Sequence, residues 1–214
     1  MAAGLPGGSA VSAPTRETQR ETAFQAVPET AFRSAARHWP TGVAVLTVRW
    51  AGLEHAKTVS SFATLSLDPP LIGVAVSRRS PLTAAVRAAG RFTVAVLGEH
   101  QAALARRFAT PGAGRAPGGF TDLPVLDAPT GGPVPAGATA WFDARLHAEL
   151  PVGDHLLLVG EALAVGEGTG RPLLHHAARY RQLGPELPPT VLPPTELRPT
   201  ELPPTDPPAQ GVGA

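Results

Sequence analysis

The sequence predicts a mainly β fold: a closed or nearly closed antiparallel barrel with a few short flanking helices. Six segments of the 214 residues have the apolar or alternating pattern of strands, and three have helix signals. The connections between the predicted strands are hairpin-like. A doubly wound sheet needs a helix after nearly every strand, and three helices are too few for it.

The first half of the predicted domain alternates short helices with strands. Pro28 opens a helix with an apolar side that includes Phe32, and Pro40 ends it. Ser80 is the N-cap of a second helix, with a proline in its first turn, and Gly90 ends that helix. The strands predicted in this half cover residues 43–48, 55–62 and 71–76.

The second half begins with a strand at 92–97 and a helix at 99–109. A long loop rich in glycine and proline follows at 111–137, and a loop of this length in a compact domain is usually functional or mobile. From 138 to 146 apolar and polar residues alternate, as in a half-buried antiparallel strand. The last long strand is predicted at 156–165.

The chain is predicted to contain one folded domain, residues 28–183, between two disordered tails, 1–27 and 184–214. From Leu187 the sequence repeats a five-residue LPPTx unit, and proline at this density favours an extended polyproline II conformation. We interpret this tail as a solvated spacer, and a ligand for a proline-recognising partner is the alternative.

The composition excludes several classes of protein. A net charge of +1 provides no electrostatic footprint for nucleic acid or an anionic membrane. The absence of cysteine excludes disulfides, thiolate metal sites and cysteine nucleophiles. The sequence shows neither a secretory signal pattern nor a run of ~18 apolar residues, so a cytoplasmic protein without a membrane span is expected.

A basic run stands between an apolar strand and the start of a helix, and it consists of Ser77, Arg78, Arg79 and Ser80. A helix N-terminus presents unpaired N–H groups and the positive end of the helix dipole, which suit a phosphate. Two arginines and two hydroxyls directly before it add charge-assisted donors. The alternative is an ordinary N-cap beside two solvated arginines.

Two further segments carry polar residues that could line a ligand site. The first is a strand segment made of Lys57, Thr58, Val59, Ser60 and Ser61. Its alternative is an exposed strand whose hydroxyls face water. The second is the entrance to the last strand, at Gly153, Asp154 and His155, where the alternative is a turn with an incidental histidine.

A metal centre is not predicted. His147 and Glu149 share a face of an alternating strand and have part of the spacing of a two-histidine, one-carboxylate iron site. A further histidine, such as His155 or His175, would be required. Such spacings arise by chance in a chain with seven histidines. The neighbours His175 and His176 are interpreted as a local surface feature.

Ten short segments, taken in order, carry a resemblance to a known family: Trp39–Val43, Thr58–Phe62, Ser66–Pro70, Arg78–Ser80, Gly90–Phe92, Leu104–Phe108, Gly153–His155, Val159–Glu161, Pro172–Leu174 and Tyr180. Their order and spacing resemble the flavin reductase family with the FMN-binding split-barrel fold. Members of that family are the small reductase components of two-component flavin monooxygenases. The resemblance covers about Phe32 to Leu183.

The resemblance implies a homodimer with FMN or FAD bound at or near the subunit interface. Thr58 to Ser61 would contact the isoalloxazine and the ribityl chain, with Lys57 as a candidate cation beside the ring. The phosphate would be taken by Ser77, Arg78 and Ser80, with Arg79 next to them. Phe108 and Tyr180 would border the flavin, and His155 would lie where the nicotinamide of NADH or NADPH stacks.

Two residue-level departures from the family pattern stand near this predicted site. Lys57 occupies a position where the family usually has an apolar residue such as methionine. The segment His175-His176-Ala177 replaces one that more often carries tyrosine or phenylalanine and then a glycine. Either departure could alter the affinity for flavin or the choice between flavins.

The function that the resemblance implies is an NAD(P)H:flavin oxidoreductase that supplies reduced flavin to a separate monooxygenase. Hydride transfer between two cofactors needs ring stacking rather than an acid–base dyad, and the sequence shows no conspicuous dyad. Two alternatives remain: a flavoenzyme that retains its flavin and acts on a small organic substrate, and a non-catalytic flavin-binding protein.

Overall fold

The computed structural model describes residues 26–110, 112, 115–116 and 120–186. The described residues up to Leu183 belong to one compact unit. The tails predicted at 1–27 and 184–214 lie almost entirely outside the described residues. None of the helices in the described part of the chain is both long enough and apolar enough to cross a membrane.

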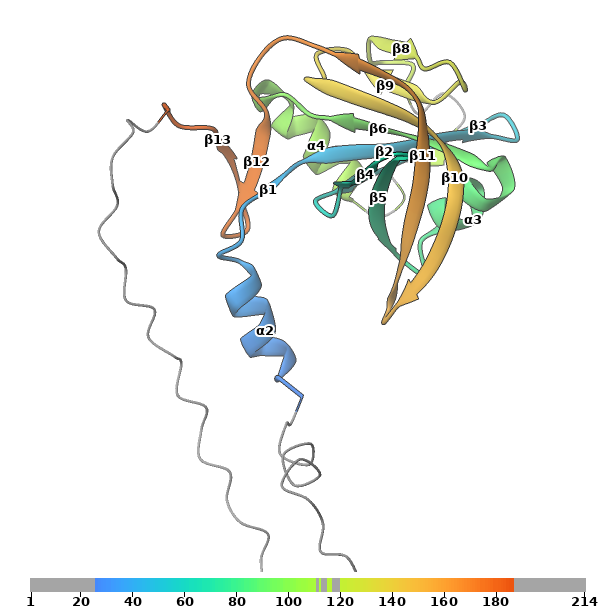
Figure 1. Cartoon of the computed structure of the whole chain (residues 1–214). Helices are drawn as coiled ribbons and strands as arrows, with labels where there is room; N and C mark the ends of the chain where they lie inside the picture. The colour runs from blue at the N-terminus through green and yellow to red at the C-terminus, as the bar shows by residue number, and fades with distance from the viewer. Residues whose placement is uncertain (1–25, 111, 113–114, 117–119, 187–214) are drawn as a thin grey trace, which may run out of the picture. The chain divides into compact units, whose positions relative to one another are not determined.

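Eight strands form the main sheet of the domain, and every neighbouring pair is antiparallel (Figure 1). In spatial order they are β4 (Ala63–Leu67), β5 (Pro70–Ser77), β11 (His155–Glu167), β10 (Ala140–Val152), β6 (Arg91–Val96), β2 (Ala44–Trp50), β3 (Leu53–Val59) and β7 (Arg115–Ala116). The mainly β, antiparallel prediction is confirmed. Within the described residues the edge strands β4 and β7 do not pair, so the ladder is open rather than closed.

The predicted strand at 55–62 ends three residues earlier in the structure. β3 ends at Val59, and the chain bends before β4 begins at Ala63. The Ser61 hydroxyl holds this bend, because it donates to the Ala75 carbonyl (2.8 Å) and accepts from the Ala75 N–H (3.1 Å). These two hydrogen bonds hold the bend against β5. This tertiary contact cannot be predicted from the alternation of polar and apolar residues.

The long loop predicted at 111–137 contains short strands, so its prediction as irregular chain was wrong in part. Besides β7 it holds a hairpin of β8 (Val125–Asp127) and β9 (Pro133–Pro135). The buried hydroxyl of Thr47 donates to the Pro133 carbonyl (2.9 Å) and so fixes β9 against β2. A second small sheet consists of β1 (Thr41–Gly42), β12 (Leu173–His176) and β13 (Arg179–Gln182).

The three predicted helices are present, with two changes of boundary: the first ends at Ala36 rather than at Pro40, and the third begins at Ala102 rather than at residue 99. They are α2 (Glu29–Ala36), α3 (Pro81–Ala89) and α4 (Ala102–Ala109). The residues before α4 form a separate 3₁₀ turn, Glu99–Gln101. Gln101 sets this break, because its side-chain oxygen accepts from the Gly98 N–H (2.8 Å) and its amide donates to the Ala136 carbonyl (2.9 Å).

Two apolar clusters on either side of β2 and β3 position the site. One packs Leu82, Ala85 and Val86 of α3 against Leu46, Val48 and Val59 of the sheet. The other packs Ala105 and Phe108 of α4 against Val43, Val45 and Ala56. Burial of these helix faces holds the start of α3 and the end of α4 beside the same strand, β3.

Gly160 of β11 marks a point of close packing between strands. A Cβ atom at this position would lie 2.5 Å from Cζ of Phe92 and 2.8 Å from Cβ of Ala144. We expect Gly160→Ala to lower the free energy of unfolding by about 1–3 kcal/mol, the usual cost of overpacking a core. Urea unfolding measures the change. Gly42→Ala is the matched control, because no atom lies within 4 Å of that Cβ position, and equal losses in both variants would contradict this packing.

Candidate functional site

A cavity of about 370 Å³ opens between β3, the turn that follows β5, the start of α3 and the end of α4. Its lining includes five of the predicted site residues, Lys57, Ser77, Arg79, Ser80 and Phe108. The other lining residues are His55, Ala56, Pro81, Leu82, Thr110 and Gly112. The structure therefore brings the lysine of the predicted strand segment and most of the predicted basic run to one hollow.

The basic run forms a tight turn between β5 and α3. The Ser80 N–H donates to the Ser77 carbonyl (2.9 Å), and the Thr83 hydroxyl contacts the same carbonyl (3.4 Å). Ser80 is the N-cap of α3 as predicted, yet its hydroxyl makes no capping hydrogen bond within the described residues. The Ser80 hydroxyl and the positive end of the helix dipole are therefore available to an anion at this end of α3.

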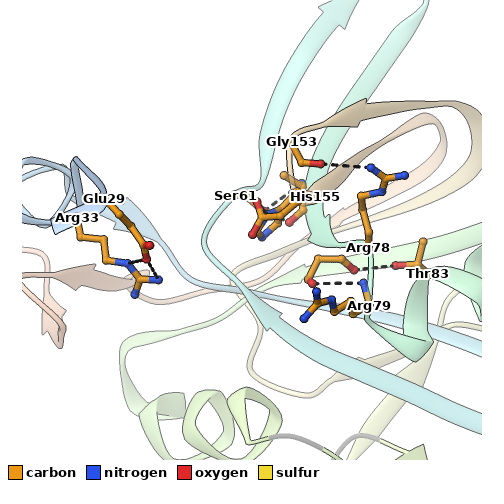
Figure 2. Close-up of polar contacts among 11 residues, drawn as sticks. Glu29, Arg33, Ser61, Arg78, Arg79, Thr83, Gly153 and His155 are labelled. Carbon is orange, nitrogen blue, oxygen red and sulfur yellow. Dashed lines mark hydrogen bonds and ion pairs between the residues drawn. The ribbon is translucent and has the colours of Figure 1, made fainter. Parts of the chain in front are cut away.

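The two adjacent arginines separate in space (Figure 2). The Arg78 guanidinium lies 3.5 Å from the Gly153 carbonyl, and its backbone N–H donates to the Asp154 carbonyl (3.0 Å). Arg79 extends away from Gly153 and lines the main cavity. Arg78 thus joins the turn to the predicted nicotinamide side, whereas Arg79 lines the main cavity and also the neighbouring hollow that Gly153 and Asp154 border.

His155 lies directly across the ladder from this turn, because it pairs with Ser77 between β11 and β5. Its Nδ1 is 2.8 Å from Oδ1 of Asp154, and the His155 side chain is about half exposed. The hydrogen bond with His155 holds the pKa of the Asp154 carboxyl below its ordinary value. The predicted phosphate side and the predicted nicotinamide side of the site are therefore neighbours.

The hydroxyls of the strand segment are mostly engaged in structural contacts. The Thr58 hydroxyl donates to the Ala105 carbonyl (2.8 Å) and so ties β3 to α4, and Ser61 bonds to β5. Thr58, Val59 and Ser60 line a smaller hollow of about 120 Å³ with Tyr180. Ser60 is exposed just past the end of β3, so its backbone N–H and hydroxyl are the donors best placed for a ligand there.

Tyr180 closes the smaller hollow from β13, between a cation and an imidazole. The Arg106 guanidinium carbon lies 5.2 Å from the Tyr180 ring centre, and the His175 ring meets that ring edge-on at 5.8 Å. Burial raises the pKa of Tyr180 above the ordinary 10.0, and the charge of Arg106 opposes this in part.

The chain contains one tyrosine, so the absorbance of tyrosinate reports Tyr180 without interference. We expect the native protein to titrate at a higher pH than the urea-unfolded protein. Because the pKa is raised on folding, the contribution of this group to stability is complete below the unfolded pKa and is lost as the pH rises through the folded pKa. Identical midpoints in native and unfolded protein would show that burial does not perturb the phenol.

His55 is a site residue that the sequence reasoning missed. It is 6% exposed and lines the main cavity two residues before Lys57. The signal that could have found it is the period of two along β3, which places His55 and Lys57 on one face.

The described residues contain no group of three histidine, aspartate or glutamate side chains that could hold a metal ion. Glu149, one of the residues considered for iron, accepts a hydrogen bond from Arg87 at 2.6 Å.

The fold and the cavity define a class: a small antiparallel β protein of split-barrel type with a cationic hollow suited to an anionic small ligand. The chain belongs to the flavin reductase like domain family, whose model matches residues 36–184. The sequence-based resemblance to flavin reductases is thereby confirmed.

Individual relatives agree with this membership. The chain is 32% identical over 169 residues to the reductase component of a 4-nitrophenol 4-monooxygenase/4-nitrocatechol 2-monooxygenase of Rhodococcus opacus, which covers 79% of this chain and 89% of that protein. It is 36% identical over 157 residues to an NADH:FMN oxidoreductase of Rhodococcus qingshengii, covering 70% and 79% respectively. The flavin reductase component of a bacterial two-component tryptophan halogenase superposes with a TM-score of 0.70 at 32% identity, over 74% of this chain and all of that structure.

Proposed function

We propose that this protein is an NAD(P)H:flavin oxidoreductase that reduces FMN or FAD and supplies the reduced flavin to a separate monooxygenase. The observation that carries the proposal is the cationic cavity between β3 and α3 in a chain of this family. The relatives named as an NADH:FMN oxidoreductase and as a monooxygenase reductase component support the activity and the kind of partner. In this proposal the protein acts in the cytoplasm and uses the nicotinamide nucleotide available there.

When both are bound, the nicotinamide and the flavin would supply the hydride-transfer chemistry. Arg79 and Ser80 would hold the flavin phosphate at the start of α3. Backbone N–H groups of the Thr58–Ser61 segment would donate toward the flavin N1 and O2 and stabilise negative charge there. The N–H groups of Ser60 and Ser61 lie past the end of the β2–β3 ladder, so they are the natural donors.

His155 positions the nicotinamide in this mechanism. When neutral, its Nδ1–H donates to Asp154, which leaves Nε2 as a hydrogen-bond acceptor. An acceptor at this point matches the N–H₂ of the nicotinamide carboxamide. Asp154 is therefore a positioning residue that selects the tautomer of His155.

A homodimer is part of the proposal because apolar side chains on α2 and β4 are exposed. Every residue of α2 is exposed, and Phe32 and Leu67 retain 65% and 94% of their accessible surface. A second copy that packs on these side chains would remove them from water. Light scattering coupled to gel filtration is expected to give twice the mass of the chain, and Phe32→Asp is expected to lower it. A monomer at micromolar concentration would contradict this part of the proposal.

A flavin titration tests the function and separates the alternatives. NADH or NADPH oxidation is followed while free FMN, FAD or riboflavin is varied. Turnover that saturates with added flavin supports the proposal. Flavin that remains bound through purification, with no response to added flavin, supports a flavoenzyme that acts on another substrate. Neither flavin binding nor nucleotide oxidation would leave only a non-catalytic role.

A further inference from the structure

Lys57 is the single lysine of the chain, since the other 17 basic residues are arginines. It lies half-buried in β3 and lines the main cavity with Ser77, Arg79 and Ser80. The lysine ammonium is a compact point charge with three donors, so at the wall of this hollow it is available to an anion that enters.

The strand register shows which way the Lys57 side chain points. Lys57 pairs with Leu46 across the β2–β3 ladder, and Val59 pairs with Ala44. Directly opposed residues of antiparallel strands share a face, so Lys57 lies on the face of the core cluster that holds Leu46 and Val59. That cluster also contains Leu82 of α3, so this is the face toward the start of α3.

The neighbouring residue Thr58 points the opposite way. Its hydroxyl donates to the Ala105 carbonyl of α4, and it lines the smaller hollow with Tyr180. Lys57 does not line that smaller hollow. The cation is therefore separated from the donors that we assign to the flavin ring.

The charges around the main cavity are unbalanced. Lys57 and Arg79 both line it, and none of its described lining residues is an aspartate or glutamate. Within the described residues, Lys57 is in no salt bridge. Asp154 borders a neighbouring hollow together with Arg79, and it forms a hydrogen bond with His155. Two like charges at one hollow repel each other until an anion enters between them.

We infer that Lys57 is a second phosphate-binding cation of the flavin site, which it closes from β3 opposite Arg79. The inference rests on the proposed flavin binding and names the ligand class that the cavity selects, phosphorylated flavins over riboflavin. It assigns the ammonium to the phosphate end of the flavin rather than to N1 and O2 of the ring. Lysine serves here as a compact point charge, whereas Arg79 adds directional donors.

Substitution of Lys57 with methionine tests the inference, because methionine keeps an unbranched apolar stem and removes the charge. The dissociation constants of FMN and riboflavin are measured by quenching of flavin fluorescence. Lys57→Met is expected to weaken FMN by about 10- to 100-fold, the range of a charge-assisted contact, and riboflavin by less than about threefold. Lys57→Arg is expected to restore most of the FMN affinity. Equal losses for both flavins, or no loss for either, would overturn the inference.

The same measurements separate this inference from the proposed function. Wild-type protein that binds neither flavin and oxidises no NADH would refute the proposed function. Wild-type protein that binds and reduces FMN while Lys57→Met binds FMN normally would refute only the role of Lys57. Circular dichroism of each variant verifies that it is folded.

A chemical measurement on the wild-type protein provides a second test that needs no substitution. Because Lys57 is the single lysine, an amine-acylating reagent modifies it and the α-amino group, and mass spectrometry of the peptides distinguishes the two. Acylation of the Lys57 peptide is compared in protein that is equally occupied by FMN or by riboflavin. FMN is expected to slow it at least about fivefold more than riboflavin does, because only FMN makes a charge-assisted contact with the ammonium. The α-amino peptide is the internal control. Equal protection by the two flavins would place Lys57 away from the phosphate.

Discussion

Replacement of Arg79 by methionine together with Ser80 by alanine is expected to raise the dissociation constant of FMN about 100-fold or more. Arg79 lines the main cavity, and the Ser80 hydroxyl makes no capping bond, so both are placed to donate to a phosphate. Each hydrogen bond to a charged group contributes ~1.5–3 kcal/mol, and ~1.4 kcal/mol corresponds to a factor of ten. Riboflavin has no phosphate and cannot make these contacts, so its affinity is expected to change less than about threefold.

Arg78→Met is the informative comparison for this double variant. Arg78 precedes Arg79 in sequence, but its guanidinium contacts the Gly153 carbonyl and does not line the main cavity. We therefore expect a smaller loss of FMN affinity from Arg78→Met than from Arg79→Met. Equal losses for FMN and riboflavin in the Arg79/Ser80 variant would show that the phosphate lies elsewhere.

The largest loss of stability is expected at Asp143, a carboxylate with no exposed surface. Its Oδ1 accepts from the hydroxyls of Thr93 (2.8 Å) and Thr130 (2.7 Å), and its Oδ2 accepts from the Thr130 N–H (2.7 Å). Asp143→Ala removes the acceptor of the buried Thr93 hydroxyl and of the half-buried hydroxyl and N–H of Thr130. At ~1–3 kcal/mol for each orphaned group, the free energy of unfolding is expected to fall by about 3–5 kcal/mol.

Two further variants, measured by urea unfolding, test whether the loss of stability comes from the buried hydrogen bonds of Asp143. Asp143→Asn keeps one acceptor oxygen and places an amide near the Thr130 N–H, so an intermediate loss is expected. Asp122→Ala removes an exposed carboxylate that pairs with Arg107 and is expected to cost measurably less than Asp143→Ala. If the Asp143→Ala and Asp122→Ala proteins unfold at the same urea concentration, the buried network does not stabilise the fold.

Local signals in the sequence were sufficient to predict the elements that begin or end at distinctive residues. The N-cap position of Ser80, the proline at the first turn of α3 and the glycine at its end all appear as predicted. The alternation before Leu146 likewise predicted part of β10. Sequence reasoning did not predict β4, β12 and β13, because each is only four or five residues long and too short for a clear alternation of polar and apolar residues.

In the candidate site, too, the sequence predicted which residues lie close together but not how their side chains are used. The order of the motifs predicted that Lys57, Ser77, Arg79, Ser80 and Phe108 would share a site, and they line one cavity. The resemblance assigned the phosphate to Arg78, whereas Arg79 lines the main cavity in the structure, because the turn after β5 decides which side chain faces it. Nor could the sequence show that the Thr58 hydroxyl joins β3 to α4, or that the Ser61 hydroxyl joins the bend before β4 to β5.

We propose that the cavity between β3 and α3 holds the flavin with its phosphate at the basic turn. A crystal structure of the protein with FMN bound tests this most directly. We expect phosphate oxygens within about 3 Å of the Arg79 guanidinium and the Ser80 hydroxyl, at hydrogen-bond distance. An FMN phosphate found elsewhere, with neither residue in contact, would contradict it.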